Sequence, residues 1–132
     1  KEITLKYEKR IKQIIEICKK NKIEPIFLTQ PSLIGKGIDP VTGVNLEQVG
    51  ISKEINGKIY WGMLERLNDI TKKVCINSNV HVIDLANLMP RNSSYYYDEV
   101  HFTNAGAEKI SELVFNDLLK YLTINYKNFL KK

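Results

Sequence analysis

The sequence has few cysteines, no long apolar run and no phosphate-binding glycine motif, and each absence excludes a class of protein. Its two cysteines, Cys18 and Cys75, lie in helical patterns without metal-ligand spacing, so neither a disulfide framework nor a metal site is predicted. No apolar run approaches the roughly 20 residues that cross a bilayer, so no membrane segment is expected. The Gly-Lys-Gly run at 35–37 matches no phosphate-binding loop. No cofactor is implied.

The charge of the chain is mildly positive. Twenty Lys and Arg residues against 15 Asp and Glu residues give a formal net charge of +5. Many of the lysines occupy the polar side of the first predicted helix, which is typical of a solvated helix face. We therefore expect no nucleic-acid partner, although clustered basic residues could neutralise phosphates. A length of 132 residues with a hydrophobic fraction of 43% accommodates one globular domain.

The spacing of apolar residues predicts three helices that alternate with two strands. Helical spacing runs from Ile3 to Cys18 and from Tyr60 to about Asn77, and it returns in a last helix that Thr103 or Asn104 caps. Two short runs, 24–30 and 80–85, read as buried strands. His81 alternates with valines in the second run, which favours a packed or edge histidine over a ligand.

Two segments complete this outline. Residues 31–58 lack a sustained period, and a loop of that length is usually functional or disordered, so we interpret it as a lid or specificity loop. Within it, Asp39 and Asn45 are interpreted as turn residues rather than calcium ligands. The last helix is expected to bury one stripe, formed by Ile110, Leu113, Val114, Leu118 and Tyr121.

The order helix, strand, helix, strand, helix is typical of a parallel α/β sheet covered by helices on both faces. Two strands are too few for an independently stable sheet. We therefore expect the missing strands to precede Lys1, so that residues 1–132 form the carboxyl-terminal part of a single domain.

Asp98 and His101 are the candidate catalytic pair. In acyl transfer an imidazole takes the proton of a hydroxyl nucleophile, and a carboxylate on its other ring nitrogen fixes the tautomer. An isolated Asp-x-x-His arises often by chance, as a turn cap beside a surface histidine. Here the pair follows the last predicted strand and precedes the last helix, and ligands of open α/β sheets bind outside the carboxyl ends of strands.

The sequence shows no nucleophile for this pair. None of its candidate serines lies at a sharp strand-to-helix turn of the kind that presents a nucleophile. The serines considered are Ser32, Ser52, Ser78, Ser93, Ser94 and Ser111. We therefore expect the attacking residue to lie upstream of this chain.

The segment Asp98–Gly106, which reads Asp-Glu-Val-His-Phe-Thr-Asn-Ala-Gly, resembles the final conserved block of the SGNH (GDSL-type) hydrolases. The runs 26–31 and 82–85 are similar to later strands of that family, and the resemblance extends from about Tyr7 to Leu122. The family's Gly-Asp-Ser nucleophile block and its oxyanion-hole blocks have no counterpart in this chain.

The resemblance implies a three-layer α/β/α, flavodoxin-like fold, of which this chain supplies two parallel strands and flanking helices. It implies that His101 is the base and Asp98 its acid in a serine esterase acting on a small acyl ester, such as an acetylated carbohydrate or a lipid ester. The chain alone is then expected to be inactive without its missing amino-terminal half. Tyr97 and Phe102 are candidate walls of the substrate pocket, although packing of the loop against the last helix explains the three tyrosines at 95–97 equally well.

A non-catalytic module of the same type is the alternative. Such a module would bind a glycan or a protein partner. An upstream region without a Gly-Asp-Ser block would favour this hypothesis over the esterase.

Overall fold

The computed structural model describes residues 2–127, which form an α/β structure with a two-stranded parallel sheet. The elements, in chain order, are α1 (Glu2–Lys20), β1 (Ile26–Leu28), α2 (Gly57–Asn77), β2 (His81–Ile83), α3 (Leu85–Leu88), the 3-10 helix η1 (Ser93–Tyr95) and α4 (Asn104–Asn125). The three long helices and two strands predicted from the sequence are therefore confirmed. None of the described helices combines the length and apolar character that a membrane span requires.

Element boundaries differ from the prediction at the start of α2 and at both strands. Helix α2 begins at Gly57, three residues before Tyr60, because the Asn56 side chain accepts a hydrogen bond from the Ile59 amide at 3.1 Å and caps the helix. Leu85, predicted to end the second strand, instead opens α3. Both strands are shorter than predicted, since only three residues of each pair with the other strand.

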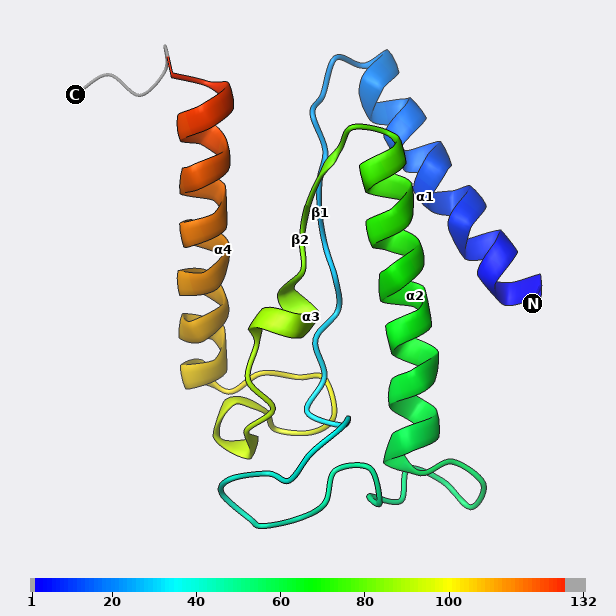
Figure 1. Cartoon of the computed structure of the whole chain (residues 1–132), viewed down its shortest axis with the longest axis vertical. Coiled ribbons are helices and arrows are strands. Elements are labelled where there is room, and N and C mark those ends of the chain that lie inside the picture. The colour runs from blue at the N-terminus through cyan, green and yellow to red at the C-terminus, as the bar shows by residue number, and fades with distance from the viewer. Residues whose placement is uncertain (1, 128–132) are drawn as a thin grey trace.

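The two strands run parallel, with Ile26 opposite His81 and Leu28 opposite Ile83. Parallel pairing places the carboxyl ends of both strands at the same end of the molecule. Figure 1 shows α1 and α2 on one side of the strands, α4 on the other, and the loops that follow β1 and α3 gathered at the carboxyl ends of the strands. The residues that close this end of the molecule come from segments far apart in the sequence.

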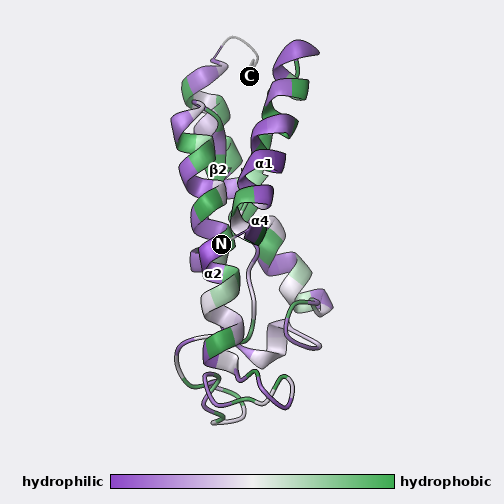
Figure 2. Ribbon diagram, turned by 90° about the vertical axis from the view of Figure 1, so that its right-hand side faces the viewer, coloured by the Kyte–Doolittle hydropathy of each residue, from purple (hydrophilic) through white to green (hydrophobic). Residues whose placement is uncertain are grey.

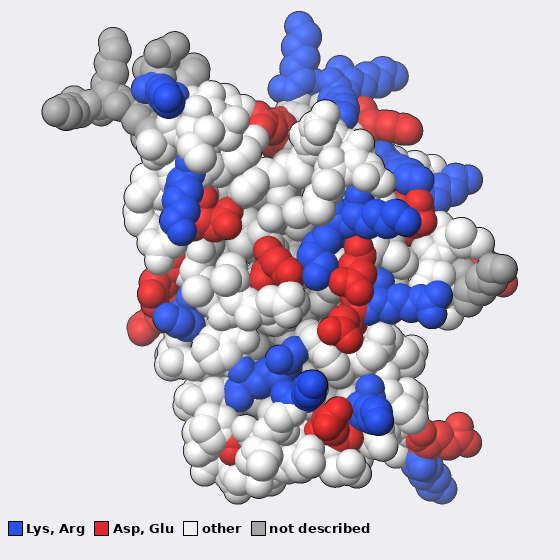
Figure 3. All heavy atoms as spheres, viewed as in Figure 1, with Lys and Arg blue, Asp and Glu red and all other residues white. Residues whose placement is uncertain are grey.

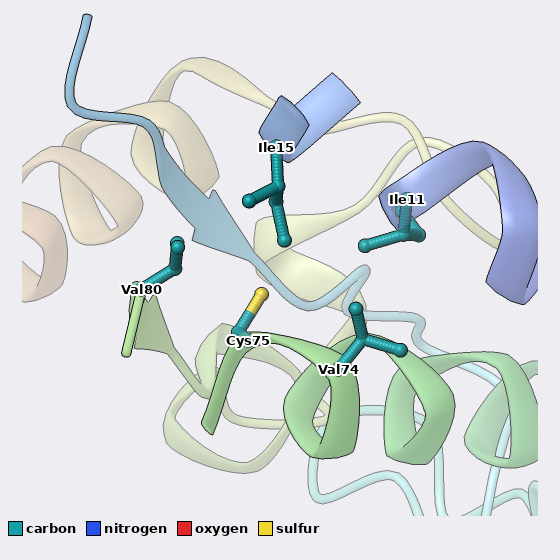
Figure 4. Close-up of a cluster of buried hydrophobic side chains, with 5 residues drawn as sticks. All are labelled: Ile11, Ile15, Val74, Cys75 and Val80. Atoms are coloured by element: carbon teal, nitrogen blue, oxygen red, sulfur yellow. The ribbon is translucent and has the colours of Figure 1, made fainter. Parts of the chain in front are cut away.

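The buried cluster lies between α1, α2 and the start of β2 (Figure 4). Its members are Ile11, Ile15, Val74, Cys75 and Val80. A hydrogen bond of 2.9 Å between the Tyr7 and Thr71 hydroxyls adds a polar link between the two helices. Cys75 is fully buried, whereas Cys18 is only half-buried.

The stripe predicted to be buried on α4 is only half-buried. This correction applies to Ile110, Leu113, Val114, Leu118 and Tyr121, and Gly106 is the one α4 residue that is fully buried. A sheet of two strands is too narrow to cover a helix of 22 residues, so apolar surface remains at its margin. Along the helices in Figure 2 hydrophilic and hydrophobic residues alternate, and the face in Figure 3 mixes basic with acidic side chains.

The first turn of α4 packs directly on the loop before it. The Thr103 hydroxyl accepts a hydrogen bond from the Gly106 amide at 3.1 Å, so Thr103 is the cap among the two predicted candidates. A Cβ atom on Gly106 would lie 2.0 Å from the carbonyl oxygen of Tyr95. Glycine at this position therefore allows the first turn of α4 to pack directly against the backbone of Tyr95.

Gly106→Ala and Gly62→Ala should change stability in opposite directions. Alanine is favoured over glycine inside a helix by about 0.5–1 kcal/mol, and a Cβ on Gly62 meets no atom within 4 Å. At Gly106 the clash with Tyr95 backbone should outweigh that gain and lower the free energy of unfolding by about 1–3 kcal/mol. Urea unfolding of both variants measures the difference. Equal stabilisation of the two would contradict the close packing at Gly106.

Candidate functional site

A short closed loop carries Asp98 and His101. The Tyr97 amide donates to the His101 carbonyl at 2.8 Å, and the Thr103 amide donates to the Tyr95 carbonyl at 3.1 Å. Tyr96 and Phe102 form an isolated antiparallel bridge between these bonds, and their rings pack at a centroid distance of 5.1 Å. Residues 97–101 are thereby held as the tip of a hairpin-like loop.

The Asp98 carboxylate organises this tip. Its Oδ1 atom accepts hydrogen bonds from the Val100 amide at 2.9 Å and from the His101 amide at 2.8 Å. These backbone donors, together with the His101 ring, hold the pKa of Asp98 at about 2, below its ordinary value of 3.8. Asp98 therefore stays a carboxylate across the neutral range.

The second carboxylate oxygen of Asp98 holds the His101 ring. Asp98 Oδ2 and His101 Nδ1 lie 2.7 Å apart, and Nε2 bonds to none of the described residues. The carboxylate accepts from Nδ1–H, so the neutral imidazole presents an unprotonated Nε2 as its acceptor. The His101 side chain is 76% exposed, which leaves Nε2 accessible.

The loop that carries Asp98 and His101 is bonded to the segment that follows β1. The Glu99 carbonyl accepts two hydrogen bonds of 2.9 Å, one from the Ser32 hydroxyl and one from the Leu33 amide. Ser32 is buried, and its oxygen also accepts from the Ile34 amide at 3.1 Å. The position of the loop is therefore set by the segment that follows the first strand.

His101 opens onto a cavity of about 520 Å³. Its lining consists of Gln30, Tyr60, Leu64, Val100, His101 and Phe102. Of the two candidate pocket residues, Phe102 lines this cavity, whereas Tyr97 is 71% exposed and does not. Val100 comes from the same loop as His101 and Phe102, Gln30 follows β1, and Tyr60 and Leu64 lie in the first turns of α2.

Gln30 and Tyr60 are site residues that the sequence reasoning did not select. Asn68 on α2 fixes the Gln30 backbone from both sides, accepting from its amide at 2.8 Å and donating to its carbonyl at 2.9 Å. Burial raises the pKa of Tyr60, and the negative charges of Glu99 and Asp98 raise it further. The Tyr60 hydroxyl therefore stays protonated beside Asp98 and His101. The sequence signal for Gln30 was its position at the carboxyl end of a predicted strand, where ligands of open α/β sheets bind.

No serine among residues 2–127 lines the His101 cavity. The Ser32 hydroxyl donates to Glu99, and the Ser94 hydroxyl donates to Asn92 at 2.6 Å. Ser93 borders a smaller, mostly apolar cavity of about 270 Å³ that contacts Asp98 but not His101. Among residues 2–127, Asp98 and His101 therefore have no serine hydroxyl beside them in this cavity.

The loop after β1 forms the walls of that smaller cavity. Apolar side chains of Leu33, Ile34, Val44, Leu46 and Val49 line it. Asp39 fixes the loop, because its buried carboxylate accepts from the Thr42 amide at 3.2 Å and from the Ser93 amide at 3.0 Å. Burial opposes ionisation of Asp39, but the hydrogen bonds from the Thr42 hydroxyl and the Ser93 amide hold its pKa well below the usual range. Asp39 acts as a turn residue, as predicted.

His81 is a packed histidine at the opposite end of the sheet. Its Nε2 atom lies 2.6 Å from Asp117 Oδ1, and its ring stacks on Tyr121 at 4.1 Å. Tyr121 in turn donates a hydrogen bond to Glu24. Across residues 2–127 no three His, Cys, Asp or Glu side chains cluster as metal ligands would.

Comparison with family models, with curated proteins and with solved structures gives no match to this chain. The chemistry of the site is therefore argued from its own geometry.

The two histidines should show opposite neutral tautomers in one ¹⁵N NMR spectrum. Asp98 holds Nδ1 of His101, whereas Asp117 holds Nε2 of His81, so the proton should reside on Nδ1 in the first ring and on Nε2 in the second. Asp98→Asn should remove the preference of His101 for the Nδ1–H tautomer and leave the tautomer of His81 unchanged. An Nε2–H tautomer for His101 in the unmodified chain would show that the hydrogen bond between Asp98 and His101 is not formed.

The amide signals of Val100 and His101 should titrate with a midpoint of about 2 when the pH is lowered from about 5 to about 1. The pKa of Asp98 is depressed in the folded state, so its hydrogen bonds are present above the ordinary value of 3.8 and are lost as the pH falls through the folded pKa. The matched control is Asp98→Asn, whose amide signals should not respond in this range. A midpoint near 3.8 would exclude the carboxylate as the acceptor of these bonds.

Proposed function

We propose that this chain supplies the acid–base pair of a serine esterase of the SGNH (GDSL) type. The observation that carries the proposal is the distance of 2.7 Å between Asp98 Oδ2 and His101 Nδ1, on a histidine whose Nε2 bonds to no described residue and which lines a cavity of about 520 Å³. A histidine held in this way is the base of acyl-transfer triads.

In the proposed mechanism the nucleophile is a serine from outside the described residues. His101 Nε2 takes the proton of the serine hydroxyl as its oxygen attacks the ester carbonyl. The resulting imidazolium is stabilised by Asp98 and gives its proton to the leaving alcohol. Water then attacks the acyl-enzyme by the same route, and the acid product leaves.

Unfilled surfaces support a nucleophile from outside. Strand β1 pairs only with β2 among the described strands, and Leu28 on it is 43% exposed. Phe115 on α4 is 62% exposed. Further strands beside β1 would cover such surfaces and complete the three-layer, flavodoxin-like fold that the sequence resemblance implies.

The walls of the cavity favour a small acyl ester as the substrate. Leu64, Val100 and Phe102 are apolar, while Gln30 and Tyr60 add an amide and a hydroxyl. Such a combination suits an acetyl group on a carbohydrate or a short lipid ester. No cofactor is needed for this chemistry.

A non-catalytic binding module of the same type is the second candidate. It is favoured by one observation, the absence of any serine from the His101 cavity among residues 2–127. The same cavity would then hold a glycan or a side chain of a protein partner.

Fluorophosphonate labelling of the natural full-length polypeptide that carries this chain distinguishes the candidates. A serine esterase should be labelled at a serine outside residues 2–127, and His101→Ala should abolish the label and lower esterase turnover by about 10⁶-fold. Asp98→Asn should lower turnover by about 10⁴-fold, because the tautomer of the base is lost.

The matched control is His81→Gln, which removes a histidine with a carboxylate partner at the other end of the sheet and should leave turnover unchanged. Labelling of Ser32, Ser93 or Ser94 would contradict an external nucleophile. Absence of any label in folded protein would favour the binding module.

A further inference from the structure

A second polar cavity, of about 500 Å³, lies against the first turns of α2. Its lining consists of Lys36, Glu47, Lys58, Trp61, Gly62, Glu65, Asn87 and Arg91. None of these residues lines the His101 cavity, although Tyr60 and Trp61 are neighbours on α2. The arrangement of Arg91 distinguishes this cavity from an ordinary surface hollow.

Arg91 is held in place by an aromatic face and a glycine. Its guanidinium carbon lies 4.1 Å from the centroid of the buried Trp61 ring, within the range of a cation–π interaction. Gly35 also lies close, since a Cβ on it would lie 2.4 Å from Arg91 Nε. The absence of a side chain at Gly35 thus provides the room that the guanidinium occupies.

The hydrogen-bond donors of this guanidinium are unused. Arg91 Nε is buried without a partner, and the group donates to no residue between 2 and 127. Burial lowers the pKa of Arg91, while the charge of Glu65 opposes that effect, so the cation is partly desolvated without a bonded counterion. Buried charges are normally paired, because an unpaired one carries a large desolvation cost.

The charge of the lining adds to this arrangement. Lys36, Lys58 and Arg91 face the cavity with two carboxylates, Glu47 and Glu65, so one positive charge remains in excess. None of these five side chains forms an ion pair of 4.0 Å or less with a described residue. A fixed guanidinium with free donors and two lysines is suited to bidentate recognition of an oxyanion.

We propose that this cavity binds the carboxylate or phosphate group of a small anionic ligand, with Arg91 as the bidentate donor and Lys36 and Lys58 as supporting charges. This site does not depend on the esterase proposal, because it needs neither His101 nor an external serine.

Trp61 provides the test, since it is the only tryptophan of the chain and lies under Arg91. Its fluorescence is followed while inorganic phosphate or acetate is added to the full chain at an ionic strength held constant with chloride. A saturable change with phosphate alone identifies a phosphate site, and one with acetate alone identifies a carboxylate site. Saturation with both identifies an oxyanion site that does not distinguish them.

Two variants link the signal to the cavity. Arg91→Gln should weaken binding at least about tenfold, because a bidentate charged contact is lost. Lys58→Gln changes an exposed residue of α2, so folding should persist while binding weakens several-fold. His101→Ala should leave the titration unchanged. A response no different from that to chloride, or an unchanged affinity in both cavity variants, would overturn the proposal.

Discussion

The parallel pairing of β1 with β2 is the constraint on which the rest of the structure depends. Because both strands run in the same direction, their carboxyl ends lie together, and the segments that follow them can bond to each other. The Glu99 carbonyl, held by Ser32 and Leu33, is the clearest case, since it joins the end of β1 to the loop after α3. An antiparallel pair would have placed these segments at opposite ends.

Within that frame Asp98 has two roles through two oxygens. One oxygen accepts backbone amides and folds the tip of the loop, and the other holds the imidazole of His101. The loop conformation and the orientation of the His101 ring are therefore coupled through one side chain. The pair His81–Asp117 has a similar distance, but the His81 ring is stacked on Tyr121 and is only 23% exposed. A histidine beside a carboxylate therefore does not by itself define a candidate site.

The sequence predicted the long helices well because their apolar spacing persists over many turns, as from Ile3 to Cys18. It predicted the half-buried stripe of α4 less well, because spacing reports which face is apolar but not how wide the covering sheet is. The sequence did not predict Tyr60 and Gln30 as residues of the cavity, because no local pattern shows which distant segments meet. Their place beside His101 follows from Asn68, which fixes the Gln30 backbone from a residue 38 positions away.

By itself, the sequence determined the order of helices and strands and brought Asp98 and His101 within three residues of each other, since local spacing and capping need no distant partner. Only the tertiary structure decided which nitrogen of His101 is held, which residues form its cavity, and that Arg91 lies close to Trp61 and Gly35 without a hydrogen bond from its guanidinium to a described residue. Those properties depend on contacts between residues far apart in the chain, and no local pattern encodes their distances.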